Sequence, residues 1–145
     1  MLTANNFFTE EQKSEIVNAI KKAELNTSGE IRVHIENSCK GNVLDRAAFI
    51  FKKLEMHKTA LRNGVLIYLA VNDKKFAVLG DAGINSVVPD NFWNESKDIM
   101  INYFKQSQFT QGLCESILII GNQLKTKFPY QKDDINELPD EISFG

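Results

Sequence analysis

The sequence has few cysteines and prolines, and it lacks a long hydrophobic run. Among its 145 residues there are two cysteines and three prolines. Cys39 and Cys114 are isolated thiols, so they exclude a disulfide-rich scaffold and are typical of a reducing compartment. No apolar stretch reaches the roughly 18 residues that a membrane-spanning helix needs. We therefore expect no membrane partner.

An excess of either charge is also lacking. The chain has 17 Lys and Arg against 19 Asp and Glu, a formal net charge of -2. This balance gives no electrostatic basis for binding nucleic acid or an anionic membrane. The first residues also lack the basic region and apolar stretch of a signal peptide. We expect a cytoplasmic protein without a nucleic-acid partner.

In its hydrophobic and charged content the chain is typical of one globular domain. Hydrophobic residues make up 43% and charged residues 25% of the chain, as in globular proteins with a buried core. We expect a single domain over residues 1–145, with its core at about 8–130. The tail at 131–145 is acidic but carries apolar residues, and we expect it to lie along the body. These apolar residues are Ile135, Leu138, Ile142 and Phe144.

Three segments have the patterns of β-strands. Glu30–Glu36 alternates between apolar and polar residues, which predicts a strand near a sheet edge or under a polar layer. Val65–Val71 is apolar throughout and predicts a buried strand. Asn72-Asp73-Lys74 predicts a tight turn, so that Lys75–Gly80 returns antiparallel. A short fourth strand is expected at 86–88.

Helical spacing of apolar residues predicts helices between and after these strands. The expected helices run from the capping box at Thr9 to about Leu25, over Leu44–His57, from Pro89 onward, and from a Thr110 cap to Pro129. Strand, helix and strand form a right-handed βαβ unit with parallel strands. The predicted fold class is α/β, a three-layer α/β/α arrangement with a central mixed sheet of about four strands.

The predicted strand directions bring polar residues together at one edge of the sheet. Asp81, at the end of the third strand, is expected beside Glu30 and Arg62, at the beginnings of the other two. Residues two strands apart are about 10 Å apart at Cα, a gap that facing side chains can close around a hydrated cation. Calcium and magnesium prefer such oxygen ligands. The alternative is that Asp81 caps the loop and pairs with Arg62.

Other kinds of site fit the sequence less well. His34, His57 and Cys39 are potential zinc ligands, but their spacing matches no standard zinc motif. A nucleophilic pair of Cys39 and His57 lacks a visible oxyanion element or orienting group. The glycines match neither a phosphate-binding loop nor a dinucleotide-binding motif. The sheet edge with Asp81 is therefore the candidate functional site.

Four motifs in order resemble the TPM domain, the domain of thylakoid lumenal phosphatase-like proteins and their bacterial relatives. The motifs are Ser28–Val33, Arg62–Tyr68, Gly80–Ile84 with Val88–Asp90, and Phe109–Leu113. The likeness runs from about residue 8 to 130. The ending, with Phe128-Pro129 and Asn136–Pro139, resembles a small single-domain bacterial branch of the family.

The resemblance implies a mixed sheet covered by helices on both faces. It also implies calcium or magnesium binding by acidic residues, and the phosphatase activity of some plant members. Glu30 matches the carboxylate of the family's Gly-x-Glu-Ile motif and Asp90 that of its Leu-Pro-Asp motif. Asp81 stands where many members have an aromatic or other residue between two glycines, so this position departs from the family pattern.

From the residues and the resemblance together, we predict a divalent-cation-binding protein whose Ca²⁺ or Mg²⁺ ligands are Asp81, Glu30 and Asp90. One alternative is a weak metal-dependent phosphatase acting on phosphomonoesters, in which Arg62 neutralises charge. Another alternative is a protein-interaction module that uses the acidic tail.

Overall fold

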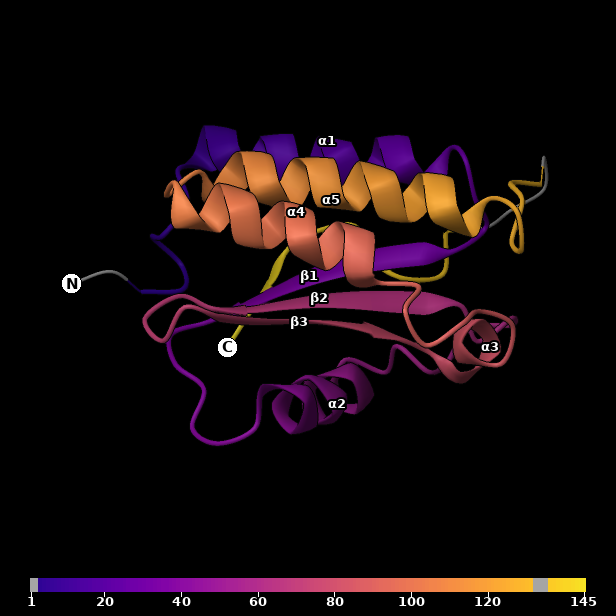
Figure 1. Cartoon of the computed structure of the whole chain (residues 1–145), viewed down its shortest axis with the longest axis horizontal. Coiled ribbons are helices and arrows are strands. Elements are labelled where there is room, and N and C mark those ends of the chain that lie inside the picture. The colour runs from indigo at the N-terminus through magenta and orange to yellow at the C-terminus, as the bar shows by residue number, and fades with distance from the viewer. Residues whose placement is uncertain (1–2, 132–135) are drawn as a thin grey trace.

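The computed structural model describes residues 3–131 and 136–145, and it places a four-stranded mixed sheet between two helical layers (Figure 1). Helices α1, α4 and α5 cover one face of the sheet and α2 covers the other. The predicted three-layer α/β/α fold is therefore confirmed. The elements in chain order are α1 (Glu10–Glu24), β1 (Glu30–Glu36), α2 (Val43–Lys53), β2 (Gly64–Ala70), β3 (Lys75–Gly80), α3 (Ala82–Asn85), α4 (Asn94–Lys105), α5 (Phe109–Leu124) and β4 (Ser143–Phe144).

The strand order in the sheet is β3-β2-β1-β4. Strands β1 and β2 are parallel, with Glu30 opposite Gly64, and β3 returns antiparallel to β2 with Gly80 opposite Val65. The predicted hairpin and strand directions are confirmed. Strand β1 lies next to the edge, because its outer neighbour is the short strand β4.

Side chains alternate between the two faces of the sheet, so each face has its own core. Ile31, Val33 and Ile35 of β1 belong to the core under α1 and α5. The residues between them point toward α2, where Leu66 and Tyr68 of β2 form the centre of the second core. Both cores contain residues that are fully buried, so the sheet is the rigid base on which the strand ends are held.

The capping predictions at the first helix are confirmed. The Gln12 N–H donates to Thr9 Oγ1 at 3.1 Å, and the Thr9 N–H donates to Gln12 Oε1 at 2.9 Å. This capping box satisfies two backbone donors that a helix start leaves free. Helix α2 ends at Lys53, earlier than the predicted His57, and turns follow it.

Three predictions after the hairpin are wrong. Residues 86–88 form no strand; the fourth strand is Ser143–Phe144, on the far side of β1. Helix α4 begins at Asn94 rather than at Pro89, because the segment from Pro89 forms turns, with the Phe92 N–H donating to Pro89 O at 3.1 Å. Thr110 does not cap α5, because the helix begins one residue earlier and Thr110 lies in its first turn.

The segment from Asn136 to Gly145 lies against the body. Leu138 is buried in the core on the α2 side. Ile142 and Phe144 pack against the core of the other face. The predicted tail residues Asp133, Asp134 and Ile135 lie outside the described residues. Within the part of the chain that is described, no helix is long and apolar enough to cross a membrane.

Candidate functional site

The strand ends meet as predicted, at the Gly64 end of β2. The Asp81 N–H donates to Gly64 O at 2.9 Å, which extends the β2–β3 ladder by one residue. On the other side, the Glu30 N–H donates to Asn63 O at 3.2 Å. These two backbone bonds bring Asp81, Glu30 and the Arg62-Asn63 loop to one end of the sheet.

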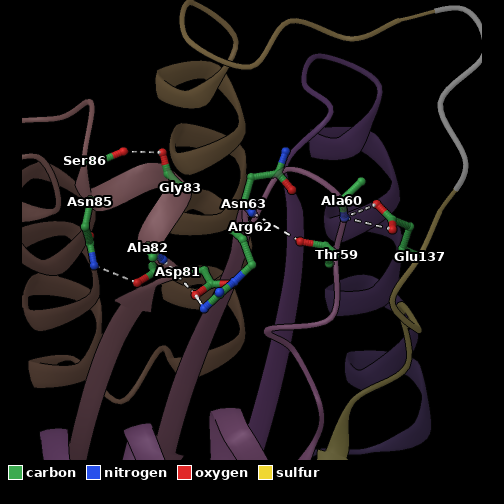
Figure 2. A network of polar contacts seen from close by, with 11 residues as sticks. Thr59, Ala60, Arg62, Asn63, Asp81, Ala82, Gly83, Asn85, Ser86 and Glu137 are labelled. Atoms are coloured by element: carbon green, nitrogen blue, oxygen red, sulfur yellow. Dashed lines mark hydrogen bonds and ion pairs between the residues drawn. The ribbon is translucent and has the colours of Figure 1, made fainter.

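Asp81 has its charge partner at this end of the sheet. Its carboxylate oxygens accept hydrogen bonds from Arg62 Nε at 2.7 Å and Arg62 Nη2 at 2.8 Å (Figure 2). Its Oδ1 also accepts from the Ala82 N–H at 2.7 Å, at the start of α3. Asp81 is 6% exposed, whereas the Arg62 side chain is half exposed. The arrangement is the one described by the alternative interpretation, in which Asp81 caps the loop and pairs with Arg62.

The loop before β2 is fixed from the side of the tail. The Asn63 N–H donates to Thr59 Oγ1 at 3.3 Å, which closes a turn within the loop. The Ala60 N–H donates to Glu137 Oε2 at 3.1 Å (Figure 2). The C-terminal segment therefore holds the same loop that carries Arg62.

The loop also lies close to the backbone of α3. The Gly83 N–H donates to Arg62 O at 2.9 Å. A Cβ atom at Gly83 would lie 2.1 Å from Leu61 O and 2.6 Å from Arg62 O. Only glycine allows this approach, so Gly83 of the Gly-Asp-Ala-Gly segment is a packing requirement. Beside it, Asn85 Nδ2 donates to Gly80 O at 2.9 Å and fixes α3 against the end of β3.

Glu30 lies at the same sheet end but does not contact Asp81. Between them is Gly64, and the space above this glycine is occupied by Met56 and Leu138, because a Cβ there would lie 3.2 Å from Met56 O and 3.5 Å from Leu138 Cδ1. Glu30 is 4% exposed, and its Oε1 accepts from the Leu138 N–H at 2.6 Å. Apolar packing thus keeps the two predicted ligands apart.

Burial raises the pKa of Glu30 to about 7. The N–H groups of Leu138 and Glu137 oppose this shift, because they stabilise the charged form, while the carboxylates of Glu137 and Asp140 add to it. Glu30 takes part in none of the ion pairs formed among the described residues. It is a buried acid surrounded by like charge.

A second acid, Glu24, lies on the outer side of β1. Its Oε2 accepts from the Ile31 N–H at 3.0 Å, in the place of a missing strand partner. Burial and a hydrogen bond with the Asp140 carboxylate raise the pKa of Glu24 to about 9. Glu24, Glu30 and Asp140 line one cavity of about 210 Å³ at the end of α1.

Asp140 adds an unsatisfied atom to this cavity, since its Oδ1 is buried and has no hydrogen-bond partner within residues 3–131 and 136–145. We did not predict Glu24 or Asp140 from the sequence. One signal was present: Glu24 is an acid in the last turn of a helix, where the helix dipole favours bases.

Asp90, the third predicted ligand, lies apart from the other two. It is exposed, in the turns between α3 and α4. Across the described ranges, no three His, Cys, Asp or Glu side chains are grouped so that they could hold one metal ion. The structure therefore brings Asp81 and Glu30 to the same sheet end, leaves Asp90 outside, and has no preassembled ligand group among the residues it describes.

The zinc alternative is also not assembled in the part of the chain that the structure describes, since His34, His57 and Cys39 form no such group. His34 is buried on β1, with its Nδ1 2.7 Å from Ser143 Oγ and its Nε2 3.4 Å from Glu36 Oε2. Burial lowers the pKa of His34. Its carboxylate neighbour is Glu36.

A family model of the TPM domain matches residues 2–123, which is most of the chain. The chain belongs to the TPM domain family. This TPM domain is similar to BA42 of the psychrophilic bacterium Bizionia argentinensis, with 51% identity, a TM-score of 0.91 and coverage of 96% of each chain. No curated protein matches it.

Two more distant solved structures share the fold. The N-terminal domain of a Porphyromonas gingivalis protein (P.gingivalis) has 17% identity and a TM-score of 0.70, covering 86% of this chain and 81% of that one. The N-terminal domain of the cg2496 protein of Corynebacterium glutamicum has 11% identity and a TM-score of 0.67, covering 87% and 80%. At these identities the likeness concerns the fold alone.

Proposed function

We propose that this TPM domain binds a divalent cation, Ca²⁺ or Mg²⁺, at the sheet end that carries Glu30 and Asp81. The observation that supports the proposal is the state of Glu30, a carboxylate that is 4% exposed and takes part in none of the ion pairs among the described residues. A buried charge without a counterion is unfavourable. A hard cation with oxygen ligands supplies the missing charge.

Protons compete with a cation for these carboxylates. The pKa of Glu30 is raised to about 7 and that of Glu24 to about 9, so near neutral pH Glu24 is protonated and Glu30 is partly protonated. A cation that binds here displaces these protons, and its affinity therefore rises with pH. The buried Oδ1 of Asp140, which has no partner among the described residues, offers a further oxygen at the same cavity.

The two other predicted ligands, Asp81 and Asp90, join Glu30 only after a change of conformation. Asp81 becomes available when Arg62, whose side chain is half exposed, turns away into solvent. Asp90 is exposed and requires a movement of its loop. Replacing each acid separately therefore distinguishes a site at Glu30 and Asp81 from a site formed by Glu30 with Glu24 and Asp140.

Isothermal titration calorimetry with CaCl₂ and with MgCl₂ at pH 6 and pH 8 tests the proposal. We expect binding to the wild type that is tighter at pH 8, and its loss in Glu30→Gln. Loss in Asp81→Asn or Asp90→Asn assigns the ion to the predicted ligand set, whereas loss in Glu24→Gln assigns it to the acidic cavity. Asp98→Asn, an exposed acid on α4, is the matched control. Equal heats for the wild type and Glu30→Gln would overturn the proposal.

The same variants separate binding from catalysis. Hydrolysis of p-nitrophenyl phosphate is measured with and without Mg²⁺, because a phosphatase would use the ion to polarise a phosphoryl oxygen. A cation-binding domain without this activity shows no magnesium-dependent turnover above that of Glu30→Gln. The tail is a weak candidate for capturing a partner protein, since Leu138 is buried and Ile142 and Phe144 pack on the body.

A further inference from the structure

The opposite end of the sheet has a cavity that the cation site does not involve. It lies where β2 and β3 join, beside the α4–α5 connection, and Figure 1 shows both turns at the same end of the molecule. Its volume is about 320 Å³, within the range of small-molecule sites. Leu69 and Val71, both buried residues at the end of β2, line its inner side.

Aromatic rings form the walls of this cavity, and they hold one another in place. Phe7 and Phe109 meet edge to face, with ring centroids 5.1 Å apart, and Phe76 and Phe104 meet in the same way at 5.5 Å. Phe104 and Phe109 connect the two pairs at 5.1 Å. Packed aromatic rings from four separate segments make a preformed apolar surface.

Two lysines, Lys74 and Lys105, also line the cavity. Both are exposed, and within the described part of the chain neither side chain forms an ion pair. Lys74 has a φ of 53°, and Ser107, which also lines the cavity, has a φ of 59°. Left-handed backbone at residues other than glycine is unfavourable and is concentrated at functional sites.

We propose that this cavity binds a small organic anion, a molecule with an apolar body and a single anionic head group. The body packs against the four phenylalanine rings, and the head lies between Lys74 and Lys105. The charge complementarity carries the assignment, since two unpaired ammonium groups border an apolar cavity in a chain of net charge -2. A neutral apolar molecule would gain no charge attraction from the two lysines.

Titrations followed by ¹⁵N–¹H correlation spectra test the proposal with 2-naphthoate and 2-naphthyl phosphate, and with neutral 2-naphthamide as the head-group control. We expect amide shifts at Val71–Phe76 and at Phe104–Phe109, and tighter binding of an anion than of the amide. The head group that binds more tightly tells a carboxylate ligand from a phosphate ligand. Binding of the amide as tight as that of both anions, or shifts confined to other segments, would contradict the proposal.

Variants of the lysines give a second measurement. The pair Lys74→Gly and Lys105→Gln removes both ammonium groups, and glycine suits the left-handed backbone at position 74. We expect roughly tenfold weaker binding of the anion and unchanged binding of the amide, since exposed charge pairs are individually weak. Lys125→Gln with Lys127→Gln removes the same charge after α5 and is the matched control.

A third variant leaves the turns unchanged. Ile101 lines the cavity and is 37% exposed, so Ile101→Glu introduces a carboxylate without opening the core. We expect this variant to repel both anions and to retain 2-naphthamide. Anion affinities equal to those of the wild type in Ile101→Glu and in the lysine pair would overturn the proposal.

Discussion

Arg62 holds both carboxylate oxygens of Asp81, at 2.7 Å and 2.8 Å, and so ties the loop before β2 to the end of β3. The Asp81 carboxylate is buried while the Arg62 side chain is half exposed. Bidentate geometry of this kind is strong and specific. This ion pair joins the loop before β2 to the end of β3.

Removal of the Asp81 carboxylate is expected to destabilise the fold. In Asp81→Ala, the Ala82 N–H loses its acceptor and Arg62 loses its partner. Loss of a helix N-cap of this kind costs about 1 kcal/mol, and we expect that loss in the free energy of unfolding from urea denaturation. Asp81→Asn, which retains an oxygen acceptor, should lose less.

A double-mutant cycle separates the ion pair from the cap. Arg62→Gln is combined with Asp81→Asn, and the coupling energy is taken from the four unfolding curves. A favourable coupling identifies the pair as a structural link at this site. Additive effects of the two replacements would mean that the bidentate contact contributes nothing to stability.

Gly83→Ala is expected to be more harmful than a helix propensity scale suggests. The added Cβ would lie 2.1 Å from Leu61 O, so α3 or the loop must move. We expect a loss of more than about 2 kcal/mol and a weakened contact between the Gly83 N–H and Arg62 O. Urea denaturation measures the loss. Ala82→Ser, at the exposed neighbouring position, is the control and should leave the unfolding midpoint nearly unchanged.

Glu36 is expected to determine how the stability of the fold decreases at acid pH. Burial alone would raise its pKa, but hydrogen bonds from Arg46, Tyr68 and His34 lower the pKa to about 2. A lowered pKa in the folded state adds stability above the unfolded value of 4.5, and this stability is lost as the pH falls toward 2.

Thermal unfolding of Glu36→Gln between pH 2 and pH 7 measures this contribution. The variant should be less stable than the wild type at pH 7, and the difference should disappear toward pH 2. Glu55→Gln, an exposed acid after α2, is the control. A difference that stays constant over the whole range would contradict the assignment.

The sequence predicted the strands of the sheet more accurately than the segments that pack around them. Strand β1 has the predicted bounds Glu30–Glu36, and β3 has the predicted bounds Lys75–Gly80, because alternation and a polar turn are local signals. Strand β4 has two residues, too few to show any period. Its pairing with β1 depends on where the tail docks, which no local pattern encodes.

The arrangement of residues at this sheet end was predicted in part. Strand directions alone placed Asp81 beside Arg62, and the ion pair is present. The separation of Glu30 from Asp81 was missed, because it results from Met56 and Leu138 packing over Gly64. Leu138 is 108 residues from Glu30 in the chain. The contact therefore depends on tertiary packing and leaves no trace in spacing.

Glu24 is expected to control how the stability of the fold falls as the pH rises. Its pKa in the folded state is about 9, above the ordinary value of 4.5, so the folded protein retains a proton that the unfolded chain releases. Stability therefore falls as the pH rises from 4.5 to 9, by at most ~1.4 kcal/mol for each pH unit, and is unaffected below 4.5. Glu24→Gln imitates the protonated acid, because its carbonyl can accept from the Ile31 N–H and its amide can donate to Asp140.

Thermal unfolding should show the variant and the wild type equal at pH 4 and the variant more stable at pH 8. Glu15→Gln, an exposed neighbour on α1, should show no such divergence, and a parallel course of the Glu24→Gln and wild-type curves would refute the protonated state of Glu24.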